Sequence, residues 1–594
     1  MPTSTGRTSG GRPTVFGRRA AVSTGHYLAT EIAIHVLRSG GNAFDAAVAG
    51  GVALQVLKPH QNGLAGEVPA LLWSAAENRP WALSGHGPAP RAATVDRFRR
   101  LGVRSIPGDG FLPAIVPPAF ASYMFLLKRF GTRTVADVLE PAMALAAHGF
   151  AMTDGLREVI AANAERFRTQ WPTSAAVWLR DGQAPAAATV FKNPDLARTL
   201  GRLIEAAAGK PRGDGCDAAA DLFYRGAIAR EILDFACGTP VADATSGAHA
   251  ALLTADDLAA YRPALEPPAQ VRWRDLDVLK CPAWTQGPAM LQTLAILRHV
   301  DLAAMGHNSA DAIHTVVEAM KLAYADREVY YGDPACADVP MDRLLSDAYA
   351  ARRAALIDPR RASLALRPGD RPPLADYASG ADVDAAYAAA AGDGSAHGDT
   401  TKLDILDPAG NAISVTTSGG WLQSSPVIPG LGFPLGTRGQ MFSLTPGHPN
   451  CLAPGKRPRS TLTPTLALRN GMPHMVFGSP GGDCQDQWAL QFLLNVELWG
   501  MSLQEAVEAP TFWSAHWPNS FYPRTCSPGQ LHVESRLDEA VVADLASRGH
   551  RIQREAAFAG GNTGACRVQH ESDGGTLLSA AASPRLEPAY ALAF

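Results

Sequence analysis

The sequence predicts an α+β fold, with helices dominating the first two thirds of the chain and β-strands dominating the last third. Apolar residues recur at helical spacing up to about residue 330, whereas apolar and polar residues alternate after residue 400. The 594 residues are 46% hydrophobic and 18% charged, which is typical of a globular protein with ample material for a core. These observations together favour one large folded body.

The first elements follow a short polar arm. Residues 1–13 are rich in Ser, Thr, Gly and Arg and predict a disordered N-terminal arm. The next stretch predicts a short strand, a helix over 28–37 that ends at Gly40-Gly41, and a helix over 43–57 capped by Asn42. Further helical patterns run over 120–130, 135–148 and 310–329.

The change from helical to β pattern coincides with a segment that has no periodicity. Pro, Gly, Asp and Ala crowd together over about 359–399, which predicts a mobile linker. This linker divides the chain into a large part, 14–399, and a small part, 400–594.

The small part opens with a β-hairpin whose register gives a threonine an unusual neighbour. Residues 401–407 and 412–416 alternate, and 408–410 form a turn, so Asp407 is expected to pair with Asn411. That register places Thr400 opposite Ser418, with their Cβ atoms about 4.5–5.5 Å apart. Cleavage before Thr400 would add an α-amine, and an N-terminal threonine uses its own amine to activate its hydroxyl. The alternative is a strand with surface threonines.

A second hairpin leads into a glycine-rich loop. Residues 463–468 and 474–477 flank an Asn470-Gly471 turn, and Gly478-Ser479-Pro480-Gly481-Gly482 then precede a helix over about 483–498. Such a strand-to-helix turn leaves backbone N–H groups able to hold a phosphate or an oxyanion. The alternative is a tight connection that needs positive φ.

Composition excludes several partners. Lys and Arg number 53 against 56 Asp and Glu, and the net charge of −3 gives no broad attraction to nucleic acid or anionic membrane. The eight cysteines lack C-x-x-C spacing, and His314, His397 and His550 lack ligand spacing, so we expect neither metal nor organic cofactor. With no signal peptide and no membrane span recognised, we expect a cytoplasmic protein that acts on a small molecule.

Several spaced motifs, taken in order from about Ala21 to Pro588, resemble the γ-glutamyltransferase family of N-terminal-nucleophile hydrolases. They are 40–47 (GGNAFDAA), 253–258 (LTADDL), 323–327 (AYADR), 332–334 (GDP), 400–401 (TT), 410–412 (GNA), 456–458 (KRP) and 478–482 (GSPGG).

The resemblance implies a precursor that cleaves itself between Asp399 and Thr400 and remains a heterodimer of its two fragments. It implies a four-layer αββα sandwich of two stacked antiparallel sheets, the N-terminal-nucleophile hydrolase fold. Thr400 Oγ would attack an amide carbonyl, the backbone amides of Gly481 and Gly482 would stabilise the oxyanion, and Ser418 would assist. Water or an amine would then take the acyl group.

The recognition positions for a γ-glutamyl group differ from the family pattern. His86 stands where the family has an arginine for the α-carboxylate, and Gly420 and Met441 stand where it has an asparagine and an acidic residue for the α-amine. Losing two or three charged hydrogen bonds would cost about 3–9 kcal/mol. We therefore expect an amidohydrolase or acylase that is not strictly γ-glutamyl specific.

Other recognition positions retain polar groups. Ser460 and Thr461 keep two hydroxyls, and Arg438, in place of a glutamine, is expected to offer a bidentate fork to a substrate carboxylate. Trp421, Phe433 and Phe442 are candidates for an apolar wall. The competing functions are a true γ-glutamyltransferase or glutathione hydrolase, and a non-catalytic scaffold member of the family.

Overall fold

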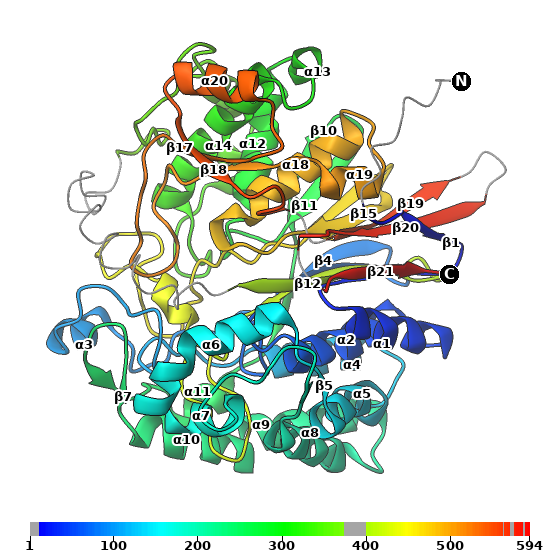
Figure 1. The fold of residues 1–594 in the computed structure, drawn as a ribbon, viewed down its shortest axis with the longest axis vertical. Helices are drawn as coiled ribbons and strands as arrows, with labels where there is room; N and C mark the ends of the chain where they lie inside the picture. Colours follow the sequence, from blue (N-terminus) through cyan, green and yellow to red (C-terminus); the bar gives the residue numbers. More distant parts are fainter. Residues whose placement is uncertain (1–10, 373–398, 562–563, 571–574, 586–587) are drawn as a thin grey trace.

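The computed structural model describes residues 11–372, 399–561, 564–570, 575–585 and 588–594. Most of the predicted arm, 1–10, and of the predicted linker, 373–398, therefore lies outside the described residues. Two seven-stranded antiparallel sheets stack face to face, and helices cover both outer faces (Figure 1). This is the αββα sandwich that the resemblance implies.

The first sheet contains the predicted Thr400 hairpin, and its strands are ordered β21-β2-β12-β13-β3-β4-β9. These strands are Tyr590–Ala593 (β21), Ala21–Thr24 (β2), Thr400–Leu406 (β12), Ala412–Ser418 (β13), Ala70–Ser74 (β3), Arg79–Ser84 (β4) and Ala264–Glu266 (β9).

The second sheet is ordered β1-β20-β19-β15-β14-β11-β10. Its strands are Val15–Gly17 (β1), Thr576–Ala582 (β20), Gly564–His570 (β19), Met472–Gly478 (β15), Thr465–Arg469 (β14), Leu276–Lys280 (β11) and Ala269–Trp273 (β10). Smaller sheets hold Phe512–Ser514 (β16), Gln530–Glu534 (β17), Arg551–Glu555 (β18), Phe150–Ala151 (β5), Val190–Phe191 (β6), Val241–Ala242 (β7) and Ala248–His249 (β8).

Helices from the N-terminal half lie below the first sheet in Figure 1, and helices from the middle and the C-terminal part lie above the second. The lower group comprises Tyr27–Arg38 (α1), Ala43–Leu57 (α2), Val95–Arg100 (α3), Ala119–Phe130 (α4), Val135–His148 (α5), Asp154–Thr169 (α6), Pro172–Trp178 (α7), Pro194–Ala207 (α8), Arg212–Tyr224 (α9), Ala227–Gly238 (α10) and Ala255–Ala260 (α11). The upper group comprises Pro288–Leu297 (α12), Leu302–Met305 (α13), Ala310–Tyr330 (α14), Met341–Leu344 (α15), Asp347–Ala354 (α16), Gln485–Glu497 (α18), Leu503–Glu508 (α19) and Glu539–Ser547 (α20).

The predicted start of the domain is confirmed. Asn42 caps α2 with a capping box, in which its side chain accepts from Phe44 N and Asp45 N while Asp45 accepts from Asn42 N. Ala43 N also donates to Asp407 Oδ2 over 2.9 Å, which ties the start of α2 to the hairpin turn. Helix α2 then delivers residues 58–62 to the end of the first sheet where β12 begins.

The predicted hairpin register is also confirmed, because Thr400 pairs with Ser418 and Leu406 with Ala412. Asp407 Oδ1 accepts from Ala409 N and Asn411 N, each over 2.9 Å, and so holds the turn. Every residue of β12 and β13 is buried, however, including the polar ones. Their polar face is covered by the second sheet, and the alternative of a strand with surface threonines is excluded.

The second predicted hairpin forms β14 and β15 around Asn470 and Gly471, both at positive φ. It belongs to the second sheet, so the glycine-rich loop leaves that sheet and enters a short 3-10 turn, Gly482–Cys484, and then α18. The loop therefore approaches the start of β12 from the opposite sheet.

The described start of the predicted linker is bonded to the folded body. Ala362 N donates to Arg548 O over 2.8 Å, Lys321 Nζ donates to Ser363 O over 2.9 Å, and Arg367 forms an ion pair with Glu318 at 3.2 Å. These bonds correct the prediction that the linker begins at about residue 359, since 359–372 are held against α14 and the small part.

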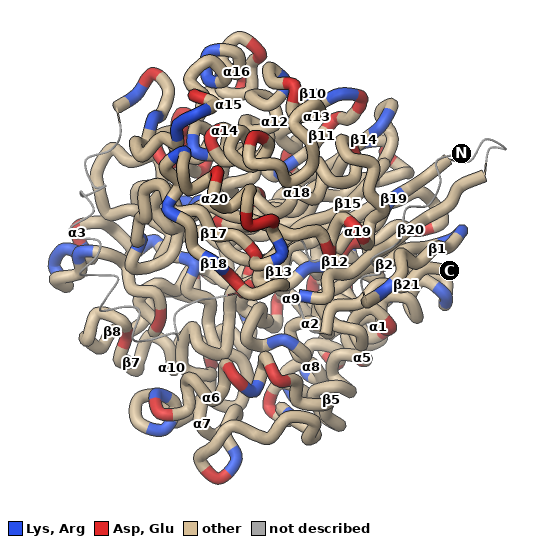
Figure 2. Tube along the Cα trace, turned by 45° about the horizontal axis from the view of Figure 1, so that its top comes forward, with Lys and Arg blue, Asp and Glu red and all other residues tan. Residues whose placement is uncertain are grey.

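Charged residues of both signs are interspersed along the chain (Figure 2). Among the described residues, no helix is long and apolar enough to cross a membrane. All eight cysteines are free thiols.

Candidate active site

Thr400 lies at the head of β12, on the face that points toward the second sheet, and is 3% exposed. Its Oγ1 donates to Ser418 Oγ over 3.1 Å and accepts from Gln485 Nε2 over 3.4 Å. Ser418 Oγ also accepts from Arg438 Nη2 over 2.9 Å. The buried threonine hydroxyl thus has two polar partners, and one of them, Ser418, is itself bonded to Arg438.

Hydrogen bonds hold both polar atoms of the peptide bond between Asp399 and Thr400, the predicted cleavage site. Thr400 N donates to Asp399 Oδ1 over 2.7 Å, and Gln61 Nε2 donates to Asp399 Oδ2 over 2.5 Å. The carbonyl oxygen of Asp399 accepts from Ser418 Oγ over 3.1 Å and from Trp421 Nε1 over 2.7 Å. The bond is therefore fixed beside the hydroxyl that would attack it.

A buried lysine, Lys58, lies near Asp399, and two buried histidines lie near that lysine. Burial lowers the pKa of Lys58 to about 8, although the nearby Asp399 charge opposes this shift. Burial, and then the charge of Lys58, lower the pKa of His26 to about 3 and that of His60 well below its usual value. Burial raises the pKa of Asp399, while its hydrogen bond from Thr400 N and the Lys58 charge act in the opposite direction. Both histidines are therefore neutral at pH 7.

Arg438 forms a buried ion pair with Glu67. Its Nε and Nη2 lie 3.0 and 2.8 Å from Glu67 Oε2, and both side chains are almost fully buried. The prediction that Arg438 offers a bidentate fork to a substrate carboxylate needs correction, because Glu67 and Ser418 already occupy that edge. Only Nη1, 3.8 Å from Met441 Sδ, is left with a weak partner among the described contacts.

Gly481 and Gly482 have the positive-φ backbone expected of a tight strand-to-helix turn, whether or not that turn also binds an oxyanion. Gly481 has φ 97° and Gly482 has φ 55°, and a Cβ at either position would clash with Trp488 or Phe521. In the described part of the chain, no acceptor is bonded to the N–H of either glycine. The loop leads within three residues to Gln485, which reaches Thr400. The oxyanion role of the two glycines stays a prediction.

The three positions that depart from the γ-glutamyl pattern carry no free charge. His86 is buried, and burial with Arg438 and Arg457 lowers its pKa well below the usual value, so it is neutral. It lines a cavity of about 460 Å³ together with Tyr261 and Arg457. Gly420 has φ 62°, and Met441 is buried against Arg438.

Ser460 and Thr461 lie beside this region. Ser460 N donates to Trp284 O over 3.0 Å, and the Trp284 ring meets His86 edge-on at 5.2 Å. Ser460 Oγ accepts from Leu462 N, whereas Thr461 Oγ1 is buried with no partner among the described residues. Gln286 joins Ser460 O to Gly482 O and so connects the hydroxyl pair to the glycine loop.

The expected apolar wall is only partly correct. Trp421 lies at the site and meets Phe521 at 6.2 Å, and Phe521 also covers Gly482. Phe433 instead stacks on Phe223 in the main core, and Phe442 belongs to a separate core cluster. Packing against helices of the lower layer removes these two from the wall.

Glu67, Gln61 and Gln485 are polar contacts of the site that sequence reasoning missed. Gln485 had one available signal, since it follows the glycine loop at the start of the predicted helix. Glu67 and Gln61 lie in the loop after α2, where no periodicity marks them.

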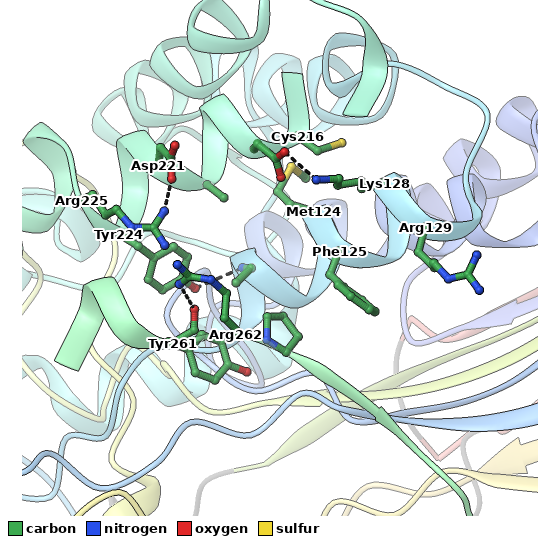
Figure 3. A pocket seen from close by; sticks show the side chains of 14 residues that line it. Met124, Phe125, Lys128, Arg129, Cys216, Asp221, Tyr224, Arg225, Tyr261 and Arg262 are labelled. Carbon is green, nitrogen blue, oxygen red and sulfur yellow. Dashed lines mark hydrogen bonds and ion pairs between the residues drawn. The ribbon is translucent and has the colours of Figure 1, made fainter. Parts of the chain in front are cut away.

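A larger cavity of about 660 Å³ lies between α4, α9 and residues 261–263, which follow α11, and contains none of the predicted site residues (Figure 3). Four of its charged groups are already paired, Lys128 with Asp217 and Arg225 with Asp221. Among the described residues, no three His, Cys, Asp or Glu side chains form a metal-binding group. His314 Nδ1 and His550 Nε2 bond to each other at 2.9 Å, and His397 lies outside the described residues.

A four-layer sandwich with a buried threonine at the head of a central strand, opposite a second hydroxyl, defines the class of N-terminal-nucleophile amide hydrolases. The family model described as Gamma-glutamyltranspeptidase matches residues 29–593. The chain therefore belongs to the γ-glutamyltranspeptidase family.

The chain is also similar to three proteins over nearly its whole length. The oxamate amidohydrolase proenzyme of Klebsiella pneumoniae is 32% identical over 573 residues, covering 94% of this chain and 96% of the relative. A solved structure of LmbA2991 has a TM-score of 0.90 at 44% identity, covering 98% of this chain and 99% of that one. The cephalosporin acylase of Bacillus halodurans has a TM-score of 0.82 at 29% identity, covering 100% and 99%.

Proposed function

We propose that this protein cleaves itself before Thr400 and then hydrolyses an acyl amide bond through an acyl-enzyme on the Thr400 hydroxyl. The observation that carries the proposal is the 3.1 Å hydrogen bond from Thr400 Oγ1 to Ser418 Oγ beside a fully held Asp399–Thr400 bond. Cleavage would free the Thr400 amine, which serves as the base for the adjacent hydroxyl. The amides of Gly481 and Gly482 would receive the oxyanion during turnover.

We propose that the preferred acyl group carries no α-amine and at most one carboxylate. Gly420 and Met441 offer no charge to an ammonium, His86 is neutral, and the charge of Arg438 is balanced by Glu67. A γ-glutamyl group would lose the hydration of two charges without compensation. Arg438 Nη1 and the Thr461 hydroxyl, which has no partner in the described part of the chain, remain for one substrate oxygen each. The names of the oxamate amidohydrolase and cephalosporin acylase relatives support this choice over glutathione.

The decisive experiment compares kcat/KM for N-oxalyl, N-glutaryl and γ-glutamyl anilides, which share one leaving group. We expect the mono-carboxylated anilides to be hydrolysed more efficiently, and mass spectrometry of a quenched reaction to find the acyl group on the fragment that begins at Thr400. A tenfold preference for the γ-glutamyl anilide would establish the competing γ-glutamyltransferase function. An uncut and inactive chain would establish the scaffold alternative.

The same assay separates water from amine as the acceptor. Adding glycylglycine should divert product to the acyl dipeptide only if transfer competes with hydrolysis. We also propose a cytoplasmic location, supported by eight unpaired cysteines, which suit a reducing compartment. Fractionation of the producing cells tests this.

A further inference from the structure

We propose that Trp421 is a catalytic residue of self-cleavage, because its indole Nε1–H and the Ser418 hydroxyl form an oxyanion hole for the carbonyl oxygen of Asp399. The inference rests on the proposed function, since it concerns the step that frees Thr400. It gives the maturation reaction a donor of its own, apart from the glycine amides expected to serve substrate turnover.

The geometry places two donors on one oxygen. Trp421 Nε1 lies 2.7 Å and Ser418 Oγ lies 3.1 Å from Asp399 O, which are distances suited to stabilising a developing negative charge. Ser418 Oγ itself accepts from Arg438 Nη2 over 2.9 Å. This charged donor polarises the Ser418 hydroxyl and strengthens its bond to the carbonyl oxygen.

Trp421 is fixed before any reaction occurs. Its Nε1 also donates to Gln61 O over 2.9 Å, and its backbone N donates to Ser424 Oγ over 3.0 Å. The next residue donates from Leu422 N to Pro59 O over 2.8 Å. The ring is 3% exposed and packs beside Phe521 and the Arg438 guanidinium. A donor held by the surrounding fold needs no reorganisation as charge develops.

The Asp399 carbonyl and the glycine amides use different parts of the site. Among the described contacts, Asp399 O bonds to Ser418 at the end of β13 and to Trp421 in the loop that follows, and to neither Gly481 nor Gly482 of the loop from the second sheet. The structure thus assigns one set of donors to the precursor's own carbonyl, and within the described ranges the N–H groups of Gly481 and Gly482 have no acceptor.

The reaction balances as an acyl shift followed by hydrolysis. Thr400 Oγ forms a bond to the Asp399 carbonyl carbon, and the π electron pair moves to the oxygen held by Trp421 and Ser418. The Thr400 hydroxyl proton passes by way of Ser418 Oγ to the Thr400 nitrogen, the oxygen's electron pair re-forms the C=O bond, and the C–N bond breaks. The product is an ester between Asp399 and Thr400 Oγ. Water then cleaves that ester to give the Asp399 carboxylate, the free hydroxyl and the free amine.

Self-cleavage of the full chain tests the role of the indole N–H. Trp421→Phe keeps an aromatic ring but removes the donor, so the first-order rate at which the 62.6 kDa chain disappears should fall about 10²–10³-fold. Trp73→Phe is the matched control, because Trp73 is buried and its Nε1 has no partner among the described residues. That control should be cut at the wild-type rate.

A second variant guards against a folding defect. Replacing Trp421 by 3-benzothienylalanine exchanges the N–H for sulfur at nearly constant shape, and it should slow cleavage to the same degree with an unchanged thermal midpoint. Hydroxylamine, which cleaves esters, should not restore the rate, since the slow step precedes the ester. Cleavage within threefold of wild type in the benzothienyl protein, or rescue by hydroxylamine, would overturn the role of Trp421.

The proposed function fails in a different way. If Thr400→Ala is still cut, or if the new N-terminus is not Thr400, self-cleavage by this threonine is wrong whatever Trp421 does. If Thr400→Ala stays whole while the Trp421 variants are cut at the wild-type rate, only the oxyanion assignment falls.

Discussion

At the scale of single residues, the hydroxyl of Ser418 makes three hydrogen bonds. It accepts from Thr400 Oγ1 and Arg438 Nη2 and donates to the carbonyl oxygen of Asp399. The nucleophile, a cation and the scissile carbonyl thus share one side chain. Arg438 is in turn held by Glu67, so Thr400, Ser418, Arg438, Glu67 and the Asp399 carbonyl form one network of five residues.

Removing the Ser418 hydroxyl should slow both self-cleavage and turnover. Ser418→Ala deletes the proton relay and removes one of the two acceptors of Arg438 Nη2, with Glu67 Oε2 as the other. Such assistance is worth about 10²–10⁴ in rate. Ser418→Thr keeps the hydroxyl and is the matched control, with most of the activity retained. Cleavage kinetics and anilide hydrolysis measure the two steps, and wild-type rates in Ser418→Ala would show that the relay is not used.

Glu67 and Arg438 should behave as a coupled pair. Glu67→Gln or Arg438→Met alone leaves one buried charge uncompensated, which typically costs about 3–5 kcal/mol, and Arg438→Met should also lower kcat for every substrate. The double variant should unfold at a higher temperature than either single one. A thermal denaturation series over the four proteins checks this, and additive losses would mean that the pair is not coupled.

At the scale of elements, the end of α2 carries a buried lysine. Lys58 is the C-cap residue of α2, its Nζ donates to Gly25 O over 3.2 Å, and it is 3% exposed. The nearby Asp399 charge raises the pKa of Lys58, but burial has the larger effect and lowers this pKa to about 8. The helix end thus places a basic group beside the cleavage site at a cost in stability.

That cost should depend on pH with a defined sign. Below pH 8 both the folded and the unfolded chain hold the Lys58 proton, so the folded state bears the full cost of the buried charge. Between pH 8 and about 10.5 only the unfolded chain holds this proton. The stability of the wild type relative to that of Lys58→Met should therefore rise with pH. We expect the thermal midpoint of wild type to rise relative to that of Lys58→Met between pH 7.5 and pH 10.

Lys210→Met, at an exposed position, serves as the control and should follow wild type at both pH values. A constant gap between wild type and Lys58→Met would mean that Lys58 keeps its ordinary titration.

At the scale of the whole molecule, the two expected fragments are interleaved in one sheet. Strand β12 of the small part pairs with β2 of the large part, and β13 pairs with β3, while β21 closes the far side of β2. Separating the fragments would expose the edges of several buried strands and the apolar layer between the sheets. The folded body therefore does not depend on the bond before Thr400.

The purified protein should accordingly give two fragments that stay together. The smaller should begin Thr400-Thr401-Lys402 by Edman sequencing, and both should co-elute in gel filtration until denaturant is added. Thr400→Ala should remain one chain. Fragments that separate without denaturant would contradict the shared sheet, and another new N-terminus would contradict the cleavage site.

The sequence by itself determined the local geometry around the nucleophile. Alternation on both sides of the 408–410 turn was enough to place Thr400 opposite Ser418, because Asp407 holds the turn and the register of a hairpin follows from its turn. Helices α1, α2 and α14 were predictable for the same reason, since spacing and capping act within a few residues. The spaced motifs further implied the stacked sheets.

Only the tertiary structure decided which polar groups meet. Lys402 and Asp404 read as the polar face of a strand, yet the second sheet buries them as an ion pair with Ser414 as a further partner. The sequence predicted that Arg438 binds a substrate carboxylate, but Arg438 forms an ion pair with Glu67, which is distant in the sequence. The Trp421 indole reaches Asp399 O because contacts with Gln61, Phe521 and Arg438 fix the ring there. Periodicity records which face of an element is apolar, whereas the partner of a buried charge or donor depends on how distant elements pack.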